Sequence, residues 1–372
     1  MTSPADGWPP RPSWWPAEPT GRRSSRRTSA GRTDPFDGMD SVHLVYRDIH
    51  GAQRVMRALV GEDGPPTDPV YLARRVVDTQ TRAEYVQKRL PAGSSRRRRP
   101  PTSTSSDTDS YDLLDNEIQI GLHLVQSFSA ERYPRELSRL VGSYLGDTEE
   151  EPFILLAERG YPAENVANRL LLDQVDAFPA SLLRALECLA AAGVVHRCLT
   201  PQTVRWDDRH VQVTDFRHAA LAEEPTGPAP EFRWAAPETR DGLEPARPSE
   251  DLYSAGLVLV HMLTGRLPGM SGAPDPRNVG GDVAEVLADF FEAANLRSTP
   301  RDVLARMGVP PSTSAGGAEM PPQLADPKFL EGRVRFDRIR RQRRSDSDSD
   351  SDSDLDMTRI FPRVDDNPPW EG

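Results

Sequence analysis

The sequence predicts an α+β protein in which a small, mainly-β part precedes a mainly-helical part, with disordered arms at both ends. Short segments rich in β-branched and aromatic residues, separated by Gly, Pro and Asp, fill residues 42–157. Longer segments with helical apolar spacing fill residues 158–308. Pro, Arg, Ser and Gly without periodicity fill residues 1–40 and 309–372, and such segments have too little apolar surface to fold.

The composition excludes several classes of protein. The net charge of −11 argues against general nucleic-acid binding. Cys188 and Cys198 are the only cysteines, which favours a reducing compartment over a disulfide framework. The N-terminus has no apolar core of a signal peptide. The longest apolar stretch, Leu252–Leu263, is shorter than the ~20 residues of a membrane span. We therefore expect a soluble, cytoplasmic protein that binds neither membrane nor nucleic acid.

The first part contains strand candidates, one insertion and one helix. Residues Pro91–Ser110 are basic and then rich in Ser, Thr and Asp, which is typical of a mobile loop. Apolar residues recur at helical spacing over Asp112–Val125, which predicts a helix. The strand candidates, which suit a small antiparallel sheet, are Ser41–Tyr46, Arg54–Val60, Val70–Arg74, Ala83–Leu90, Ser138–Tyr144 and Pro152–Ala157.

The second part contains four helix candidates. Pro179–Gly193 is amphipathic and has glycine at its end. Ser249–Gly265 is more uniformly apolar, as a buried helix would be. The last two candidates are Val283–Ala294 and Thr299–Met307, and the latter opens with a cap residue followed by proline.

The C-terminal arm carries Ser-Asp repeats over Ser345–Asp354, which must stay extended because their like charges repel. Thr358 follows in an acidic context and precedes Ile360 and Phe361. Phosphorylation of Thr358 would suit an Arg-lined phosphothreonine reader with the two apolar residues as anchors. One hypothesis is therefore that this tail recruits protein partners. The alternative is that the repeats only keep the protein soluble.

Five motifs occur in one order in the second part, namely HRCLTPQT (His196–Thr203), VTDFR (Val213–Arg217), WAAPE (Trp234–Glu238), DLYSAG (Asp251–Gly256) and LRST (Leu296–Thr299). They resemble the catalytic loop, the metal loop, the Ala-Pro-Glu motif, the buried helix and the closing Arg element of eukaryotic-like Ser/Thr protein kinases. The resemblance covers roughly residues 42–308 and implies a two-lobed kinase fold in a degenerate, bacterial member of that family.

In the first part, the resemblance implies a nucleotide lobe. Lys88, one of only two lysines in the chain, falls at the position that pairs with the α- and β-phosphates, although a solvated strand lysine is the alternative. Glu117 is placed to reach Lys88, with Asp115 as the alternative. The family's glycine loop corresponds to Gly61–Pro69. Gly61 begins this stretch, whose two glycines have the wrong spacing and whose three prolines cannot donate an N–H. Nucleotide binding is therefore an open question.

The catalytic loop departs furthest from the family. Cys198, Thr200 and Thr203 stand where the family has a base Asp, a Lys and a metal-binding Asn. A thiol cannot imitate the geometry of a carboxylate, and a Thr hydroxyl is a poor substitute for a point charge. His196 and Arg197 open this loop, and the resemblance implies that His196 packs structurally rather than activating the cysteine.

The metal loop keeps one residue of the family's motif and replaces another. Asp215 remains and could bind Mg²⁺ between the phosphates of ATP. Arg217 replaces the family's glycine, and it could pair with Asp215, with Glu117 or with a phosphate, or replace the metal ion with its own charge.

The scaffold motifs are retained. Glu238 and Arg297 match the family's buried carboxylate–guanidinium pair. Asp251 matches the residue that caps the backbone of the catalytic loop. Because structural parts are kept while phosphotransfer parts are lost, we expect a Ser/Thr pseudokinase with a regulatory or scaffolding role and optional ATP and Mg²⁺ binding. The alternatives are an atypical active ATP-dependent kinase or other transferase, and a nucleotide-independent interaction protein.

Overall fold

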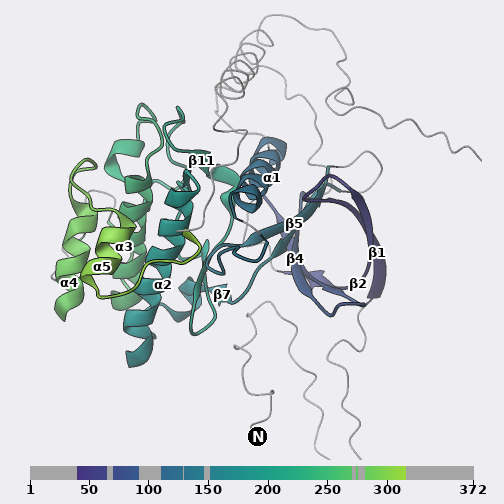
Figure 1. Ribbon diagram of the computed structural model, residues 1–372, viewed down its shortest axis with the longest axis horizontal. Coiled ribbons are helices and arrows are strands. Elements are labelled where there is room, and N and C mark those ends of the chain that lie inside the picture. The colour runs from purple at the N-terminus through teal and green to yellow at the C-terminus, as the bar shows by residue number, and fades with distance from the viewer. Residues whose placement is uncertain are drawn as a thin grey trace, which may run out of the picture. The chain divides into compact units, whose positions relative to one another are not determined.

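The computed structural model describes residues 40–64, 70–91, 110–128, 130–145, 151–269, 274 and 281–315 (Figure 1). The predictions for the N-terminal arm, for most of the insertion at 91–110, for the Ser-Asp repeats and for Thr358 lie outside the described residues. None of the helices in the described part of the chain combines the length and apolar character that a bilayer crossing requires.

Six antiparallel strands form a closed barrel in the order β1-β2-β3-β4-β6-β5, seen end-on in Figure 1. All six predicted strands are present. They are β1 (Asp40–Asp48), β2 (Gln53–Asp63), β3 (Leu72–Asp78), β4 (Glu84–Arg89), β5 (Arg139–Tyr144) and β6 (Phe153–Ala157).

The barrel closes because β1 pairs with both β2 and β5, whereas the sequence predicted only a sheet. At the seam, Arg47 lies opposite Ser143. A Cβ atom at Gly142 would lie 2.3 Å from the Tyr46 ring and 2.5 Å from the Arg47 carbonyl, so glycine permits this close approach. Closure leaves the sheet without an exposed edge.

The prediction that the third strand covers Val70–Arg74 was wrong by several residues, since β3 extends to Asp78. The cause lies in the charged side chains that interrupt its apolar pattern. Arg75 pairs across the sheet with Glu84, and Arg74 donates to Gln87 at 2.6 Å. These cross-strand pairs on β4 accommodate the charges within a strand.

The helix α1 (Ser110–Ser127) packs against the barrel and begins at Ser110, which the sequence assigned to the insertion. Leu114 and Ile118 of this helix join the apolar cluster of Tyr71, Leu90, Leu140, Ile154 and Leu156. Gly121 permits the contact with β5, because a Cβ there would lie 2.9 Å from Cβ of Leu140. The second barrel cluster comprises Leu44, Met56, Ala58, Val76, Phe153 and Leu155.

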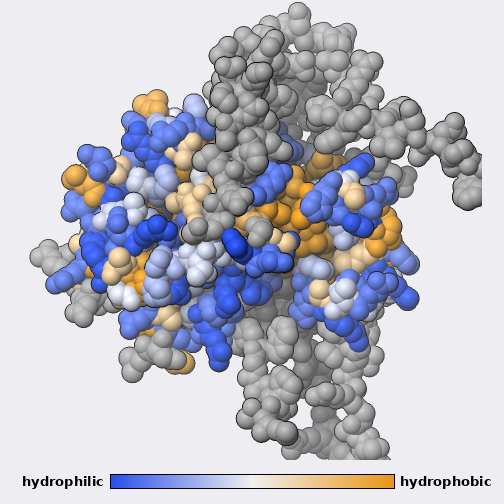
Figure 2. Space-filling view, in the orientation of Figure 1, coloured by the Kyte–Doolittle hydropathy of each residue, from blue (hydrophilic) through white to orange (hydrophobic). Residues whose placement is uncertain are grey.

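The second part is built mainly from helices, joined by short strands. Its helices are α2 (Leu172–Ala191), α3 (Pro248–Thr264), α4 (Gly281–Ala288) and α5 (Pro300–Arg306). Its strands are β7 (Tyr161–Pro162), β8 (Val194–Val195), β9 (Val204–Trp206), β10 (Val211–Val213) and β11 (Ala220–Leu221). In the view of Figure 2 the outer face of this part is largely hydrophilic, because its apolar side chains point inward.

Two helix boundaries in the second part differ clearly from the sequence prediction. The helix α2 starts at Leu172 rather than Pro179, because Phe178 is fully buried against Trp206 with ring centroids 5.1 Å apart, which anchors the extra turns. The helix predicted to run to Ala294 ends at Ala288 and continues only as a short 3-10 turn to Phe291. In this turn Phe290 is buried beside Gly256 of α3.

The C-terminal arm was predicted to begin at residue 309, but residues 309–315 pack on α2. The backbone N–H of Ser312 donates to Glu187 at 2.7 Å, and its hydroxyl lies 3.2 Å from the Cys188 thiol. Ala315 is buried. Ser312, one of the small polar residues that made this stretch look unstructured, therefore acts as a hydrogen-bond partner of the helix.

The helix α3 is the central buried element, as its uniform apolar character predicted. Every residue from Glu250 to Met262 is buried, and the helix ends at Gly265 in the left-handed conformation. Its first turn carries Asp251, which faces the loop between β8 and β9. The rigid core helix thus positions the loop that carries the candidate catalytic residues.

Candidate functional site

Lys88 lies on β4 with its ammonium group between two buried carboxylates. Its Nζ is 3.1 Å from Oε1 of Glu117 on α1 and 3.2 Å from Oε1 of Glu158, which follows β6. Lys88 is 8% exposed and Glu117 is 1% exposed. The structure thus brings Lys88 to Glu117, the first choice of the sequence reasoning, rather than to Asp115.

Glu158 is a member of the site that sequence reasoning missed. Its carboxylate accepts from the hydroxyl of Thr214, the residue before Asp215, and lies 3.5 Å from the guanidinium of Arg205 on β9. Arg205 is fixed by its own donation to the carbonyls of Arg159 and Gly160, at 3.0 and 2.7 Å. The only signal in the sequence is a carboxylate directly after the buried run of β6.

The protonation of the three groups follows from their surroundings. Burial raises the pKa of Glu117, and Lys88 opposes that effect. Burial would also raise the pKa of Glu158, but Lys88 and Arg205 hold it below its ordinary value. Burial would lower the pKa of Lys88, but the carboxylates of Glu117 and Glu158 raise it. The lysine is therefore an ammonium ion, with Glu158 as the counterion that stays ionised.

Asp215 is 7% exposed and has a positive φ of 70°, which is uncommon for a residue with a side chain. Nη2 of Arg217 lies 3.2 Å from its Oδ2, so of the alternatives open from sequence the arginine takes the pairing with Asp215. The guanidinium of Arg217 also lies 5.3 Å from the centre of the Tyr71 ring. Asn116 of α1 donates to the carbonyls of Arg217 and Ala219, both at 2.9 Å, and ties this loop to the helix.

The start of the catalytic loop is held by Asp251. Its carboxylate accepts from the backbone N–H of His196 at 2.6 Å and of Arg197 at 2.8 Å. The His196 ring is fully buried, and its Nε2 lies 3.0 Å from the Thr214 carbonyl. Burial lowers the pKa of His196 to about 4. The ring is thus neutral and packed, as expected from the sequence, and its Nδ1 accepts from the Cys198 backbone N–H at 3.3 Å.

The three substituted positions of this loop bond mainly to the loop itself. Cys198 is 5% exposed, and burial raises the pKa of its thiol. The hydroxyl of Thr203 donates to the Cys198 carbonyl at 3.0 Å and accepts from the Thr200 backbone N–H at 2.9 Å. The Thr200 hydroxyl accepts from Gln202 and Thr203 N–H groups, at 3.3 and 3.2 Å. None of the three offers a charge to a reacting group.

The predicted glycine loop is described only at its start, since residues 65–69 lie outside the described part. Gly61 belongs to strand β2 rather than to a loop, at a point where the register with β3 shifts between Val60 and Asp63. The Asp63 carboxylate, 2.7 Å from the guanidinium of Arg89, is part of an ion pair with that strand residue.

Glu238 and Arg297 form a bidentate pair. Both guanidinium nitrogens reach the carboxylate, and Nη2 lies 3.0 Å from Oε2. Arg297 also donates to the carbonyls of Ser249 and Glu292, at 3.1 and 2.8 Å. Its side chain is 2% exposed and that of Glu238 is 23% exposed. The pair joins the Ala-Pro-Glu segment to the start of α3.

The residues of the metal loop do not fit a divalent cation as they stand. Asp215 already faces a guanidinium, and the Thr203 hydroxyl is engaged in the loop. Among the described residues, no three His, Cys, Asp or Glu side chains converge as a metal site would require. Lys88 is shared by two carboxylates, those of Glu117 and Glu158.

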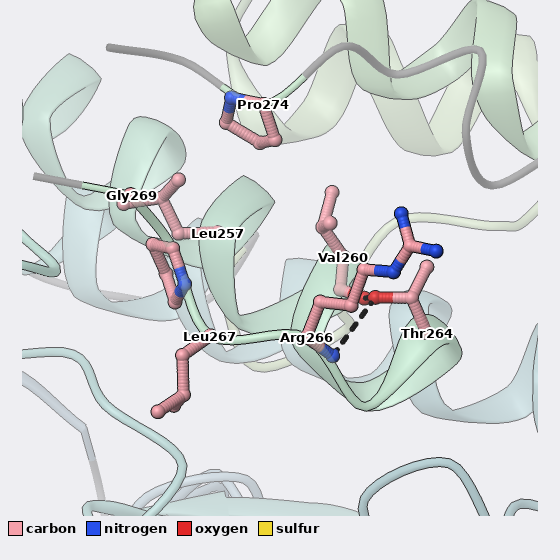
Figure 3. Close-up of a pocket in the computed structure, with 8 residues that line it drawn as sticks. Leu257, Val260, Thr264, Arg266, Leu267, Gly269 and Pro274 are labelled. Atoms are coloured by element: carbon pink, nitrogen blue, oxygen red, sulfur yellow. Dashed lines mark hydrogen bonds between the residues drawn. The ribbon is translucent and has the colours of Figure 1, made fainter. Parts of the chain in front are cut away.

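A separate cavity of about 130 Å³ lies beside the C-terminal end of α3 (Figure 3). Leu257, Val260 and Leu267 give it an apolar lining, and the backbone N–H of Arg266 donates to Thr264 at 3.2 Å at its rim. None of its lining residues belongs to the charged cluster around Lys88, so the cavity adds nothing to that site.

Comparisons with known proteins agree with the geometry. Residues 153–291 match the protein kinase domain family. The chain is 35% identical over 170 residues to the probable serine/threonine-protein kinase pknA2 of Bifidobacterium longum, covering 41% of this chain and 21% of that protein. It is 37% identical over 160 residues to the serine/threonine-protein kinase PkaA of Streptomyces coelicolor, covering 40% and 26%.

A yeast relative, the serine/threonine-protein kinase GIN4 of Saccharomyces cerevisiae, is 34% identical over 124 residues, which is 32% of this chain and 10% of that protein. The chain thus spans about a quarter or less of the length of these relatives. With a family model that matches residues 153–291, related Ser/Thr kinases and the five motifs in order, this region of the chain is a protein kinase domain of the eukaryotic-like Ser/Thr type.

Proposed function

We propose that this protein is a catalytically impaired member of its family, a pseudokinase that acts through regulation or scaffolding. The single observation that carries the proposal is the state of Cys198. It stands where the family has its base, yet it is a buried thiol whose pKa is raised. A neutral thiol cannot accept the proton of a substrate hydroxyl near neutral pH.

The neighbouring positions support the same conclusion. The family's Lys neutralises charge on the transferred phosphoryl group, and its Asn holds a metal ion. Thr200 and Thr203 carry no charge, and their hydroxyls are bonded within the loop. Loss of a general base alone costs ~10²–10⁴-fold in rate. Loss of charge stabilisation and of metal binding adds to that cost.

An active enzyme is the competing function. It rests on Lys88 and Glu117, which lie 3.1 Å apart, and on Asp215, all three of which are retained. Against it stand the Arg217–Asp215 pair and the second carboxylate at Lys88, because both occupy the groups that a nucleotide and its metal would use. A pseudokinase that works without bound nucleotide is therefore better supported than an active enzyme.

A phosphotransfer assay tests the proposal. The full chain, incubated with γ-labelled ATP, Mg²⁺ or Mn²⁺ and generic Ser/Thr substrates, should label neither itself nor the substrates above the level of Asp215→Ala. Steady-state turnover of ~1 s⁻¹, within the ordinary range for kinases, would overturn the proposal if Asp215→Ala abolishes it.

A scaffold needs protein partners, and we propose that the C-terminal tail recruits them. Support comes from the sequence alone, where Thr358 lies between the Ser-Asp repeats and two large apolar residues. A pull-down comparing the full chain with one truncated after Arg344 tests this role. Partners that bind only the full chain support it, whereas equal recovery leaves the tail as a solubility device.

A further inference from the structure

Six charged side chains form a buried set of ion pairs. The cations are Lys88, Arg205 and Arg217, and the anions are Glu117, Glu158 and Asp215. Each of the six side chains is 12% exposed or less. We call this set the ion-pair cluster.

The cations of the ion-pair cluster are already paired with carboxylates of the chain itself. A nucleoside triphosphate brings several negative charges, and a site for it must supply cations or a metal ion. Here Lys88 is already shared by Glu117 and Glu158. Nη2 of Arg217 lies 3.2 Å from Oδ2 of Asp215. The Lys88–Glu117 pair is one that the family keeps with nucleotide bound, so the obstacle is Glu158. A phosphate at Lys88 would bring further negative charge beside this buried, ionised carboxylate, which is unfavourable.

The same contacts join elements that are distant in sequence. Lys88 comes from β4, Glu117 from α1 and Glu158 from the segment after β6, and Arg205 comes from β9. Through Glu158 and the Thr214 hydroxyl the barrel is bonded to the strand that leads into Asp215. Asn116 of α1 then holds the loop after Asp215 through its carbonyls.

We infer that the ion-pair cluster, with Glu158 at its centre, takes the place of bound nucleotide. It pairs the cations of the site with the chain's own carboxylates and so excludes nucleoside triphosphates. This inference rests on the proposed pseudokinase function and deepens it, since it names Glu158 and Arg217 as the residues that prevent nucleotide binding.

Thermal melting of the full chain with ATP, alone and with Mg²⁺ or Mn²⁺, tests the inference. A ligand present at ~100 times its dissociation constant should raise the melting temperature of a domain of this size by roughly 5–10 °C. We expect no rise for the parent protein with millimolar ATP. A rise of that size that Lys88→Met removes would overturn the inference.

The variant Glu158→Gln keeps the shape of the side chain and removes its charge. It should melt below the parent without ligand, because Lys88 and Arg205 lose their shared counterion, and it should gain an ATP-dependent rise. The matched control is Glu187→Gln, another buried carboxylate paired with an arginine, which lies on α2 outside the cluster. The control should gain no ATP response.

Parent-like melting of Glu158→Gln, or the absence of any ATP response in it, would overturn the inference. If Glu158→Gln does not fold, Arg217→Gln, which frees Asp215, is measured in the same way and is expected to gain a rise with Mn²⁺ and ATP. Lack of that rise counts against the inference equally. ATP binding by the parent without phosphotransfer refutes only this inference, whereas phosphotransfer at kinase rates refutes the pseudokinase proposal as well.

Discussion

Replacing Glu238 by alanine removes the carboxylate partner of Arg297 and leaves its guanidinium, 2% exposed, in the helical part. Removal of one partner of a buried pair costs about 3–5 kcal/mol, because the remaining charge is left uncompensated. Arg297 keeps the carbonyls of Ser249 and Glu292 and lies 4.9 Å from the centre of the Tyr253 ring. These groups offset part of the loss, so we expect Glu238→Ala to lower the free energy of unfolding by about 3 kcal/mol, the lower end of that range.

For a domain of this size, 1 kcal/mol corresponds to roughly 2–4 °C, so Glu238→Ala should melt about 6–12 °C below the parent. The assay is thermal unfolding followed by circular dichroism, with urea unfolding as a second measure. The matched control is Asp289→Ala, which breaks the more exposed pair with Arg306, whose side chains are 20% and 48% exposed. Exposed pairs contribute about 0–1 kcal/mol.

Melting of Glu238→Ala within error of Asp289→Ala would contradict this prediction. Such a result would mean that the carbonyls of Ser249 and Glu292 satisfy Arg297 without the carboxylate. The assignment of the pair as the element that fixes the Ala-Pro-Glu segment to α3 would then be wrong.

Three further predictions concern buried groups. The stability difference between the parent and His196→Phe should be constant above pH 6.5. Below pH 6.5 the free energy of unfolding of the parent should fall, relative to that of His196→Phe, by about 1.4 kcal/mol per pH unit down to about pH 4. The reason is that the His196 ring takes up a proton in this range only in the unfolded chain. A difference that does not vary with pH in urea unfolding contradicts this. Cys188 and Cys198 should react slowly with iodoacetamide in the native protein and rapidly in denaturant, since both are buried and burial raises both pKa values. Fast native labelling of Cys198 contradicts this. Gly160→Ala should lower stability by at least about 1 kcal/mol, because Gly160 has a φ of 70° and a Cβ atom would lie 2.3 Å from the Trp206 carbonyl. A parent-like melting temperature contradicts this.

Local pattern accounts for most of the strands and helices that the sequence predicts. β-branched runs between turn residues located the barrel strands, and uniform apolarity located the buried helix α3. The motifs likewise brought Lys88 to Glu117 and placed Asp251 under the catalytic loop. The spacing of the motif residues along the chain predicts their positions, because these residues lie on strands and helices that the apolar patterns locate.

The parts that sequence reasoning missed depend on long-range contacts. Closure of the barrel needs the pairing of β1 with β5, which are separated by about 90 residues, and no local pattern encodes it. Glu158 has no motif of its own, and its role arises only where β4, α1 and β9 converge. Arg217 had several partners of suitable charge, and the fold selected Asp215 among them.

The central claim is that this kinase domain has lost phosphotransfer, and a single-turnover experiment tests it most directly. The full chain is mixed in excess with γ-labelled ATP and Mg²⁺, and protein-bound and released phosphate are measured from seconds to one hour. We predict that neither product rises above that of the Asp215→Ala variant. Conversion of the bound ATP at roughly 1 s⁻¹, the lower end of ordinary kinase rates, and its loss in Asp215→Ala would contradict the claim.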